Sequence, residues 1–324
     1  MPLLLGDPYA ARRPRPPRRP SRALLVALVL AVLATLAGPV PLAQAQRVAD
    51  PTTDYPRLPP RCEGDLHKIP TKPGPCFVTE FRSSRPTVVL WGDSHAWQYV
   101  PAVLAAARAR HANLVGFFMG GCPPVKVPLK PPPDGYASIC EKHNAMAMRY
   151  VKKLQRGPQD LRVLLGSSWA GYRRADREIK AGAGEAYYGY NAWVKQMVRL
   201  FMCCAAPLFP ALGKVGVDVD VIGQTATVPR TTAPCPTGEE PYTCDMPRKR
   251  AVYDEYQTRR WLRGLMTELA GRPRLIEVND EFCGPTLCHG MVDGIYTFYD
   301  DLHLSATRMR TFRPYFRQTM RALR

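Results

Sequence analysis

Five short apolar runs recur along this chain, and a stretch of helical periodicity follows each of them. The runs lie at residues 87–91, 114–118, 162–166, 217–223 and 274–278. Continuous apolar runs of this length are typical of strands that are buried on both faces of a sheet. The helical patterns lie at residues 97–107, 138–154, 191–203, 248–270 and from 305 onward. This alternating order predicts a three-layer α/β/α sandwich around a parallel five-stranded sheet.

The composition is compatible with such a core. Hydrophobic residues make up 46% of the chain and charged residues 22%, which excludes a disordered tail, a collagen and a coiled coil. The 34 prolines among 324 residues are about twice the usual share of roughly 5%, so we expect long loops between the elements. We expect a Pro-rich, disulfide-containing arm at residues 46–85 and one domain without internal repeats at residues 86–324.

The first 45 residues have the pattern of an N-terminal export signal. Six arginines lie between residues 12 and 22, residues 23–36 are almost entirely apolar, and Ala43-Gln44-Ala45 offers small residues for cleavage. An uncleaved anchor is the alternative, and it would keep the protein next to the membrane. We favour cleavage because Gly38, Pro39 and Pro41 interrupt the run before the ~20 residues that a membrane span needs. Both readings predict an extracytoplasmic protein, secreted or in the cell envelope.

The chain is basic, with a formal net charge of +18. Residues 1–45 carry six Arg and one Asp, so the remainder keeps a net charge of +13. In an exported protein this charge favours anionic envelope polymers or lipid head groups over nucleic acid as partners. An arginine excess also follows from genome composition, so the charge carries little weight for function.

All ten cysteines follow residue 45, and an even number in an exported chain predicts disulfides. Spacing pairs Cys62 with Cys76, Cys122 with Cys140, Cys235 with Cys244, and Cys283 with Cys288. Adjacent cysteines cannot easily bridge one another, so we do not expect a bond between Cys203 and Cys204. The chain has no Cys-x-x-Cys motif and its histidines are scattered, which argues against a metal site.

The first predicted strand runs directly into Gly92-Asp93-Ser94-His95. This order puts Ser94 at the carboxyl end of a parallel strand and near the start of a helix, where open α/β sheets bind ligands and where a helix N-terminus favours negative charge. Asp93 or Ser94 can also serve only as a helix cap in such a position. The tetrapeptide alone therefore leaves both possibilities open.

A second polar motif, Asp300-Asp301-Leu302-His303-Leu304-Ser305, precedes the last predicted helix. A serine nucleophile needs a base, and the base needs a carboxylate that fixes its tautomer and stabilises its charged form. Asp300 and His303, three residues apart on one turn, can supply both groups. An Asp-x-x-His on its own is more often a surface turn.

Taken together, these motifs resemble the SGNH hydrolase family over residues 87–316. The resemblance is greatest to exported SGNH domains that are fused to, or work beside, integral-membrane O-acyltransferases. The motifs that carry it are Gly92-Asp93-Ser94-His95, Cys122-Pro123-Pro124, Trp169 after the third strand, the Cys283 and Cys288 pair, and Asp300-x-x-His303-Leu304-Ser305. The resemblance implies an SGNH/flavodoxin-like fold, with Ser94 as nucleophile, His303 as base and Asp300 as the orienting acid.

The resemblance also implies an oxyanion hole formed by the N–H of Ser94 and by Gly120 or Gly121. Many SGNH enzymes add an Asn after the third strand, but here the sequence is Gly166-Ser167-Ser168-Trp169. The third donor is therefore unassigned, with Ser167, Ser168 or a water as candidates. We expect Trp169, Asp93 and His95 to be near the substrate, although each of them can equally be a packing residue.

The implied reaction is acyl transfer through an acyl-Ser94 intermediate, with acetyl as the acyl group that the family suggests. We expect an exported O-acyltransferase that modifies a cell-envelope polysaccharide or glycan and receives its acyl group from a membrane acyltransferase. It would need no cofactor. A free-standing carbohydrate esterase is the first alternative, because the same triad serves both reactions. The second is a glycan-binding or assembly protein without turnover, which the missing Asn keeps open.

Overall fold

The computed structural model describes residues 50–63, 69–128, 135–182, 192–228 and 244–323. The predicted export segment at residues 1–45 and the predicted partner of Cys244, Cys235, lie outside the described residues. Both remain predictions.

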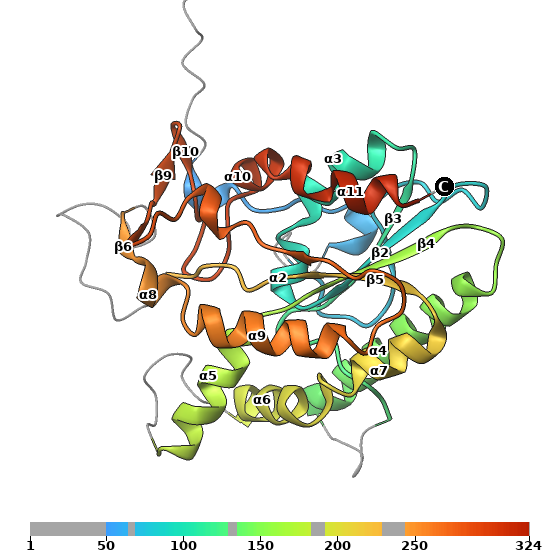
Figure 1. Ribbon diagram of the computed structural model, residues 1–324, viewed down its shortest axis with the longest axis horizontal. Helices are drawn as coiled ribbons and strands as arrows, with labels where there is room; N and C mark the ends of the chain where they lie inside the picture. The colour runs from blue at the N-terminus through green and yellow to red at the C-terminus, as the bar shows by residue number, and fades with distance from the viewer. Residues whose placement is uncertain (1–49, 64–68, 129–134, 183–191, 229–243, 324) are drawn as a thin grey trace, which may run out of the picture. The chain divides into compact units, whose positions relative to one another are not determined.

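A six-stranded sheet lies at the centre of the fold (Figure 1). Its strands in spatial order are β1 (Cys76–Phe77), β3 (Asn113–Phe118), β2 (Thr87–Gly92), β4 (Leu161–Gly166), β5 (Asp218–Ile222) and β7 (Leu275–Ile276). The last five of these are parallel and coincide with the five apolar runs. The predicted count of five was wrong, because β1 in the Pro-rich arm pairs antiparallel with β3. Two residues are too few to give a hydrophobic pattern.

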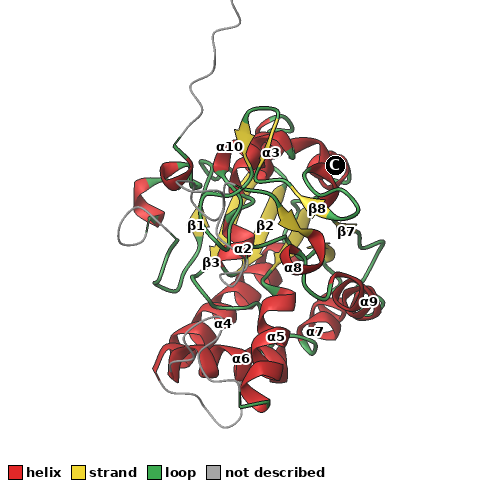
Figure 2. Cartoon of the chain, turned by 90° about the vertical axis from the view of Figure 1, so that its left-hand side faces the viewer, coloured by secondary structure: helices red, strands yellow, loops and turns green. Residues whose placement is uncertain are grey.

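Helices cover both faces of the sheet, so the predicted three-layer sandwich is confirmed. Val88 and Leu90 of β2 face one cluster of buried side chains, and Val89 and Trp91 face the other. The first face carries α2 (Ser94–Trp97), α3 (Val100–Arg108), α10 (Ala306–Thr311) and α11 (Arg317–Arg321). The second carries α4 (Gly135–Gln155), α5 (Trp169–Lys180), α6 (Ala192–Cys204), α7 (Leu208–Val215) and α9 (Glu255–Met266). Figure 2 shows α4, α5 and α6 gathered on this second side, away from α3 and α10.

Short elements complete the described chain. Two small antiparallel ladders pair β6 (Met246–Pro247) with β8 (Leu287–Cys288) and β9 (Met291–Val292) with β10 (Ile295–Tyr296). Helix α8 spans Arg248–Ala251. The 3₁₀ turns are η1 (Pro51–Thr53), η2 (Pro60–Cys62), η4 (Asn279–Glu281) and η5 (Arg313–Phe316).

Several predicted helices differ from those observed. The helix expected at residues 248–270 is broken between α8 and α9, where Asp254 takes a left-handed conformation with φ of 53°. Helices α5 and α7 were not predicted. In α7, Pro210 lies in the first turn, where its missing N–H costs no helical hydrogen bond, and Gly216 caps the end with φ of 74°. Proline and glycine are usually signs against a helix, but here they mark the beginning and the end of α7.

Three predicted disulfides are confirmed: Cys62–Cys76, Cys122–Cys140 and Cys283–Cys288. The expectation for Cys203 and Cys204 was wrong, because these adjacent residues are bonded to each other at the carboxyl end of α6. Their Cα atoms are 3.7 Å apart, closer than in an ordinary disulfide, and a bond between neighbours closes a small ring at the helix end. Disulfides of this number are typical of an oxidising compartment.

None of the described helices is by itself long and apolar enough to cross a membrane. The consecutive helices α6 and α7 meet the length and composition of a span only when taken together, with a bend of 52° between them.

Candidate active site

Ser94 is the first residue of α2, and only Asp93 separates it from the carboxyl end of β2. A Cβ atom on Gly92 would lie 1.7 Å from the carbonyl oxygen of Gly166 in β4, so only glycine fits this turn. Asp93 caps α2 by accepting a hydrogen bond from the His95 N–H at 2.8 Å. These contacts hold Ser94 at the carboxyl edge of the parallel sheet, as expected from the sequence.

Asp93 links this turn to the loop after β4. Its second carboxylate oxygen accepts hydrogen bonds from the Ser167 hydroxyl at 2.7 Å and the Ser168 N–H at 3.1 Å. Burial raises the pKa of Asp93, and these hydrogen bonds oppose the rise. Both oxygens of the Asp93 carboxylate are therefore occupied, and the Ser167 hydroxyl and the Ser168 N–H are already engaged by Asp93.

Asp300 and His303 lie together on the turn before α10. The Asp300 carboxylate accepts hydrogen bonds from the backbone N–H groups of Leu302 and His303 at 2.8 and 2.7 Å. Both of its oxygens lie 3.0 Å from Nδ1 of His303. Burial acts to raise the pKa of Asp300, but His303 and these hydrogen bonds outweigh it and lower the pKa. An ionised Asp300 favours the tautomer with the proton on Nδ1 of His303, which leaves the lone pair on Nε2.

Nε2 of His303 is buried and has no hydrogen-bond partner among the described residues. Buried polar atoms are nearly always paired, and an exception is typical of groups that meet a ligand or substrate. The imidazole lies against α2, with ring centroids 5.3 Å from His95 and 6.1 Å from Trp97. It makes no direct hydrogen bond to Ser94 in this structure, and such contacts often tighten only when substrate binds.

Two residues that the sequence did not single out position His303. Tyr299 stacks on the imidazole at a centroid distance of 5.6 Å, and its hydroxyl lies 3.3 Å from Nδ1. Gln98, which is wholly buried, accepts a hydrogen bond from the Leu304 N–H at 2.9 Å. Gln98 follows Ser94 by one helical turn, and this spacing was a signal that the sequence offered. Through Gln98 the helix of the serine is joined to the loop of the histidine.

His95 lines the same cavity as Ser94 but is a poor base. It is 4% exposed. Burial lowers its pKa to about 3, and the neighbouring His303 acts in the same direction. His95 is therefore neutral near pH 7 and a weaker base than an ordinary histidine.

The two glycines after β3 are not equivalent. The N–H of Gly120 already donates to the carbonyl oxygen of Pro70 at 3.0 Å. Gly121 has φ of 63°, a left-handed conformation that favours glycine, and it lines a cavity together with Ser94. Of the two, Gly121 is the better candidate for an oxyanion donor.

A comparison of the sequence with models of protein families assigns the chain to a family. The family model described as "SGNH domain (fused to AT3 domains)" matches residues 61–318. The chain belongs to this SGNH family. Membership supports an acyl-transfer or ester-hydrolysis role, and the AT3 domains to which such domains are fused are acyltransferases.

Other comparisons add little to the assignment of this SGNH domain. No curated protein matches the chain. Among solved structures, the periplasmic domain of the lipopolysaccharide acetyltransferase of Salmonella ser. Paratyphi A is similar, with 11% identity over 74% of this chain and 85% of that chain. The TM-score is 0.43, and we draw no conclusion about this chain from a likeness at that level.

Trp169 of the SGNH domain is a core residue. It is fully buried, and its Nε1 donates to the carbonyl oxygen of Ile222 at 2.8 Å. Its ring packs against Phe201 and Trp261. In this structure Trp169 is therefore a packing residue, which is the alternative that the sequence left open.

A cavity of about 170 Å³ opens beside Ser94. This cavity was not predictable from the sequence, because part of its wall comes from α5 and α6, far along the chain from the motifs. Its lining residues are Asp93, Ser94, His95, Gly121, Ser168, Gly171, Tyr172, Ala175, Trp193, Val194, Met197, Val198 and Leu302.

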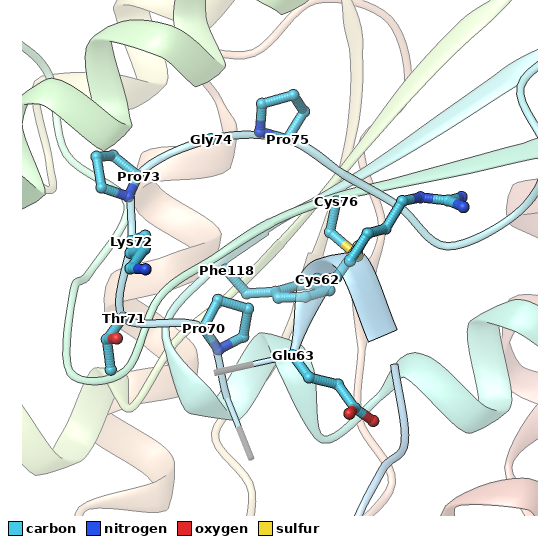
Figure 3. A pocket seen from close by; sticks show the side chains of 11 residues that line it. Cys62, Glu63, Pro70, Thr71, Lys72, Pro73, Gly74, Pro75, Cys76 and Phe118 are labelled. Atoms are coloured by element: carbon cyan, nitrogen blue, oxygen red, sulfur yellow. A yellow bond between two sulfur atoms is a disulfide. The ribbon is translucent and has the colours of Figure 1, made fainter. Parts of the chain in front are cut away.

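A second cavity, of about 190 Å³, lies in the Pro-rich arm and shares no lining residue with the first (Figure 3). Pro70, the Cys62–Cys76 disulfide and Phe118 of β3 surround it. Because Pro70 also accepts the hydrogen bond from Gly120, this part of the arm supports the glycine loop next to Ser94. Within the described ranges, no group of three or more His, Cys, Asp or Glu side chains is arranged to hold a metal ion.

Proposed function

We propose that this protein is an exported SGNH serine O-acyltransferase that moves an acyl group to a hydroxyl of a cell-envelope polysaccharide or glycan. The observation that carries the proposal is the buried, unpartnered Nε2 of His303, backed by Asp300 and adjoining the helix that begins with Ser94. Export is supported by the disulfides Cys62–Cys76, Cys122–Cys140 and Cys283–Cys288.

In the first half-reaction, Nε2 of His303 takes the proton of the Ser94 hydroxyl while Oγ attacks the carbonyl carbon of the donor ester. The N–H groups of Ser94 and Gly121 stabilise the negative charge on the carbonyl oxygen. The intermediate collapses when the ester C–O bond breaks, and the leaving alkoxide receives the proton from His303. Acyl-Ser94 and a neutral His303 remain.

In the second half-reaction, an acceptor hydroxyl attacks the acyl carbon, and His303 takes the acceptor's proton. The bond from the acyl carbon to Ser94 Oγ breaks, and Oγ recovers the proton from His303. A sugar hydroxyl as acceptor makes the protein a transferase, and water makes it an esterase. The acyl donor would come from a membrane acyltransferase, since SGNH domains of this family are fused to AT3 domains.

The proposal is tested by incubating the protein and its Ser94→Ala variant with an activated acyl ester, with and without an oligosaccharide acceptor. We expect Ser94-dependent release of the leaving group, and an acceptor that gains acyl mass at the expense of hydrolysis. Release that an acceptor never diverts would make the protein an esterase. Equal behaviour of both proteins, with glycan binding unaffected by Ser94→Ala, would favour a binding protein without turnover.

A further inference from the structure

The cavity beside Ser94 has one polar end and one apolar body. The polar groups lie around Ser94, where the Asp93 carboxylate accepts hydrogen bonds from the backbone N–H groups of His95 and Ser168. The Tyr172 side chain also hydrogen-bonds to Asp93. Beyond them the walls are formed by Ala175 of α5 and by residues of α6. Those residues of α6 are Trp193, Val194, Met197 and Val198.

Four of these five wall residues belong to the packed core, and Trp193, at 39% exposed, lies at the surface. Ala175, Met197 and Val198 are between 1% and 3% exposed, and Val194 is 9% exposed. The side chains of these four residues carry no charge and no hydrogen-bonding group, and Trp193 adds a single donor, its indole N–H. A sugar ring in this body would leave most of its hydroxyls without partners, which is costly. An apolar chain would instead gain from burial.

The position of the cavity selects which part of an ester substrate enters it. Ser94 and Gly121 are among the residues that line the cavity, so the carbonyl carbon bonded to Ser94 Oγ would lie beside them. The acyl chain is the group attached to that carbon, and it stays with the enzyme between the two half-reactions. The body of the cavity is therefore adjacent to the acyl chain of the intermediate.

The volume indicates how long this chain is. The cavity measures about 170 Å³, and a dry apolar cavity of about 150 Å³ is enough to hold benzene. An acetyl group would leave most of it empty. Resting on the proposed acyl-Ser94 chemistry, we infer that the cavity between α5 and α6 holds the acyl chain of the intermediate, and that this chain is apolar with about six carbons.

The test is a series of p-nitrophenyl esters with acetyl, butyryl, hexanoyl and octanoyl chains, assayed with the full-length protein and with Ser94→Ala. The acyl group on Ser94 is identified by mass spectrometry. We expect kcat/KM to be at least about tenfold higher for hexanoyl than for acetyl, because apolar pockets discriminate chains by this order.

Three variants separate the cavity from general hydrophobic preference. Val194→Phe fills the cavity and should lower the hexanoyl-to-acetyl ratio of kcat/KM by about tenfold or more. Met197→Ala enlarges it and should move the optimum toward octanoyl. Met202→Ala is the matched control, since Met202 lies on the same helix but is 45% exposed and does not line the cavity. It should leave the ratio unchanged.

Val194→Phe and Met197→Ala change the preferred chain length in opposite directions. If one of them fails to fold, the other still tests the inference. Ser94-dependent release that favours acetyl, or a ratio that no cavity variant moves, would overturn the inference and leave the proposed function standing. If no ester acylates Ser94, the proposed function and the inference fail together.

Discussion

Two buried polar clusters of this fold are built on opposite principles. The Asp220 cluster lies toward the amino ends of β4, β5 and β7. There the fully buried Asp220 accepts hydrogen bonds from Arg162 at 3.2 Å, Arg274 at 2.6 Å and Thr319 at 2.8 Å. The His303 cluster lies at the carboxyl ends of the strands and comprises His95, Tyr299, Asp300 and His303. Here Nε2 of His303 has no partner among the described residues.

This difference between the clusters indicates that the Asp220 cluster serves stability and the His303 cluster serves function. Every oxygen of Asp220 has a partner, so that cluster is complete without a ligand. A buried nitrogen without a partner costs free energy in the folded state, and at His303 the fold bears this cost next to the helix that begins with Ser94. Substitutions in the two clusters should therefore affect different quantities.

The largest effect is expected for Ser94→Ala. It removes the nucleophile but no hydrogen bond that supports the fold, so ester turnover should fall by about 10⁴-fold or more while the melting temperature is unchanged. Steady-state kinetics and thermal unfolding measure both. Residual turnover within tenfold of the unsubstituted protein would exclude Ser94 as the nucleophile.

The second largest effect is expected for Asp300→Asn, which should lower kcat by about 10²–10⁴-fold. The amide keeps the size of the side chain but removes the negative charge that holds the proton on Nδ1 of His303. The measurement is kcat against pH. An Asp301→Asn variant is the control on the same turn and should retain kcat within about tenfold, whereas equal losses would reassign the orienting acid.

Asp220→Asn should show the reverse pattern. It leaves the guanidinium groups of Arg162 and Arg274 without their buried counter-charge, and breaking a buried ion pair costs about 3–5 kcal/mol of unfolding free energy. Denaturant unfolding should reveal this loss, while kcat/KM of the folded protein stays within about twofold. A large change in kcat/KM without a change in stability would contradict the division between the clusters.

The smallest effect concerns pH. Burial holds the pKa of His95 at about 3 in the folded chain, whereas an unfolded histidine takes up its proton near pH 6.5. The unfolded state therefore binds more protons below pH 6.5, and the free energy of unfolding falls as the pH falls. From pH 7 to pH 5 the His95 contribution is about 2 kcal/mol.

A His95→Gln variant isolates this contribution. His143, whose pKa burial lowers to about 4, adds a similar pH dependence to both proteins and cancels in the comparison. Between pH 7 and pH 5 the free energy of unfolding should fall by about 2 kcal/mol less in the variant than in the unsubstituted protein. Identical pH dependence in the two proteins would show that His95 is not held neutral in the fold.

The sequence predicted what local patterns determine. Strand β2 and the turn at Ser94 follow from a buried apolar run and a glycine that only a tight turn requires. The contact between Asp300 and His303 was predictable because the two residues are three positions apart on one turn. The pairs Cys122–Cys140 and Cys283–Cys288 were predictable because short loops join them.

The features of the fold and of the site that the sequence did not predict depend on contacts between distant segments. Gln98 and Leu304, which share a hydrogen bond, are 206 positions apart in the sequence. The cavity walls on α5 and α6 lie next to Ser94 only through the arrangement of the whole sheet and its helices. The sequence left Trp169 open between substrate contact and packing, because its place next to the site does not determine the direction of its side chain. β1 was missed since it gains its partner, β3, only in the folded protein.

The central claim is that His303 activates Ser94, and covalent labelling by an activated phosphonate ester tests it most directly. The rate of labelling, with the modified residue mapped by peptide mass spectrometry, is measured for the unsubstituted protein, His303→Ala and Asp220→Asn. We predict modification of Ser94 alone, a rate at least about 10²-fold lower in His303→Ala, and an unchanged rate in folded Asp220→Asn. Labelling of Ser94 at the same rate without His303, or no labelling of Ser94 at all, would contradict the account.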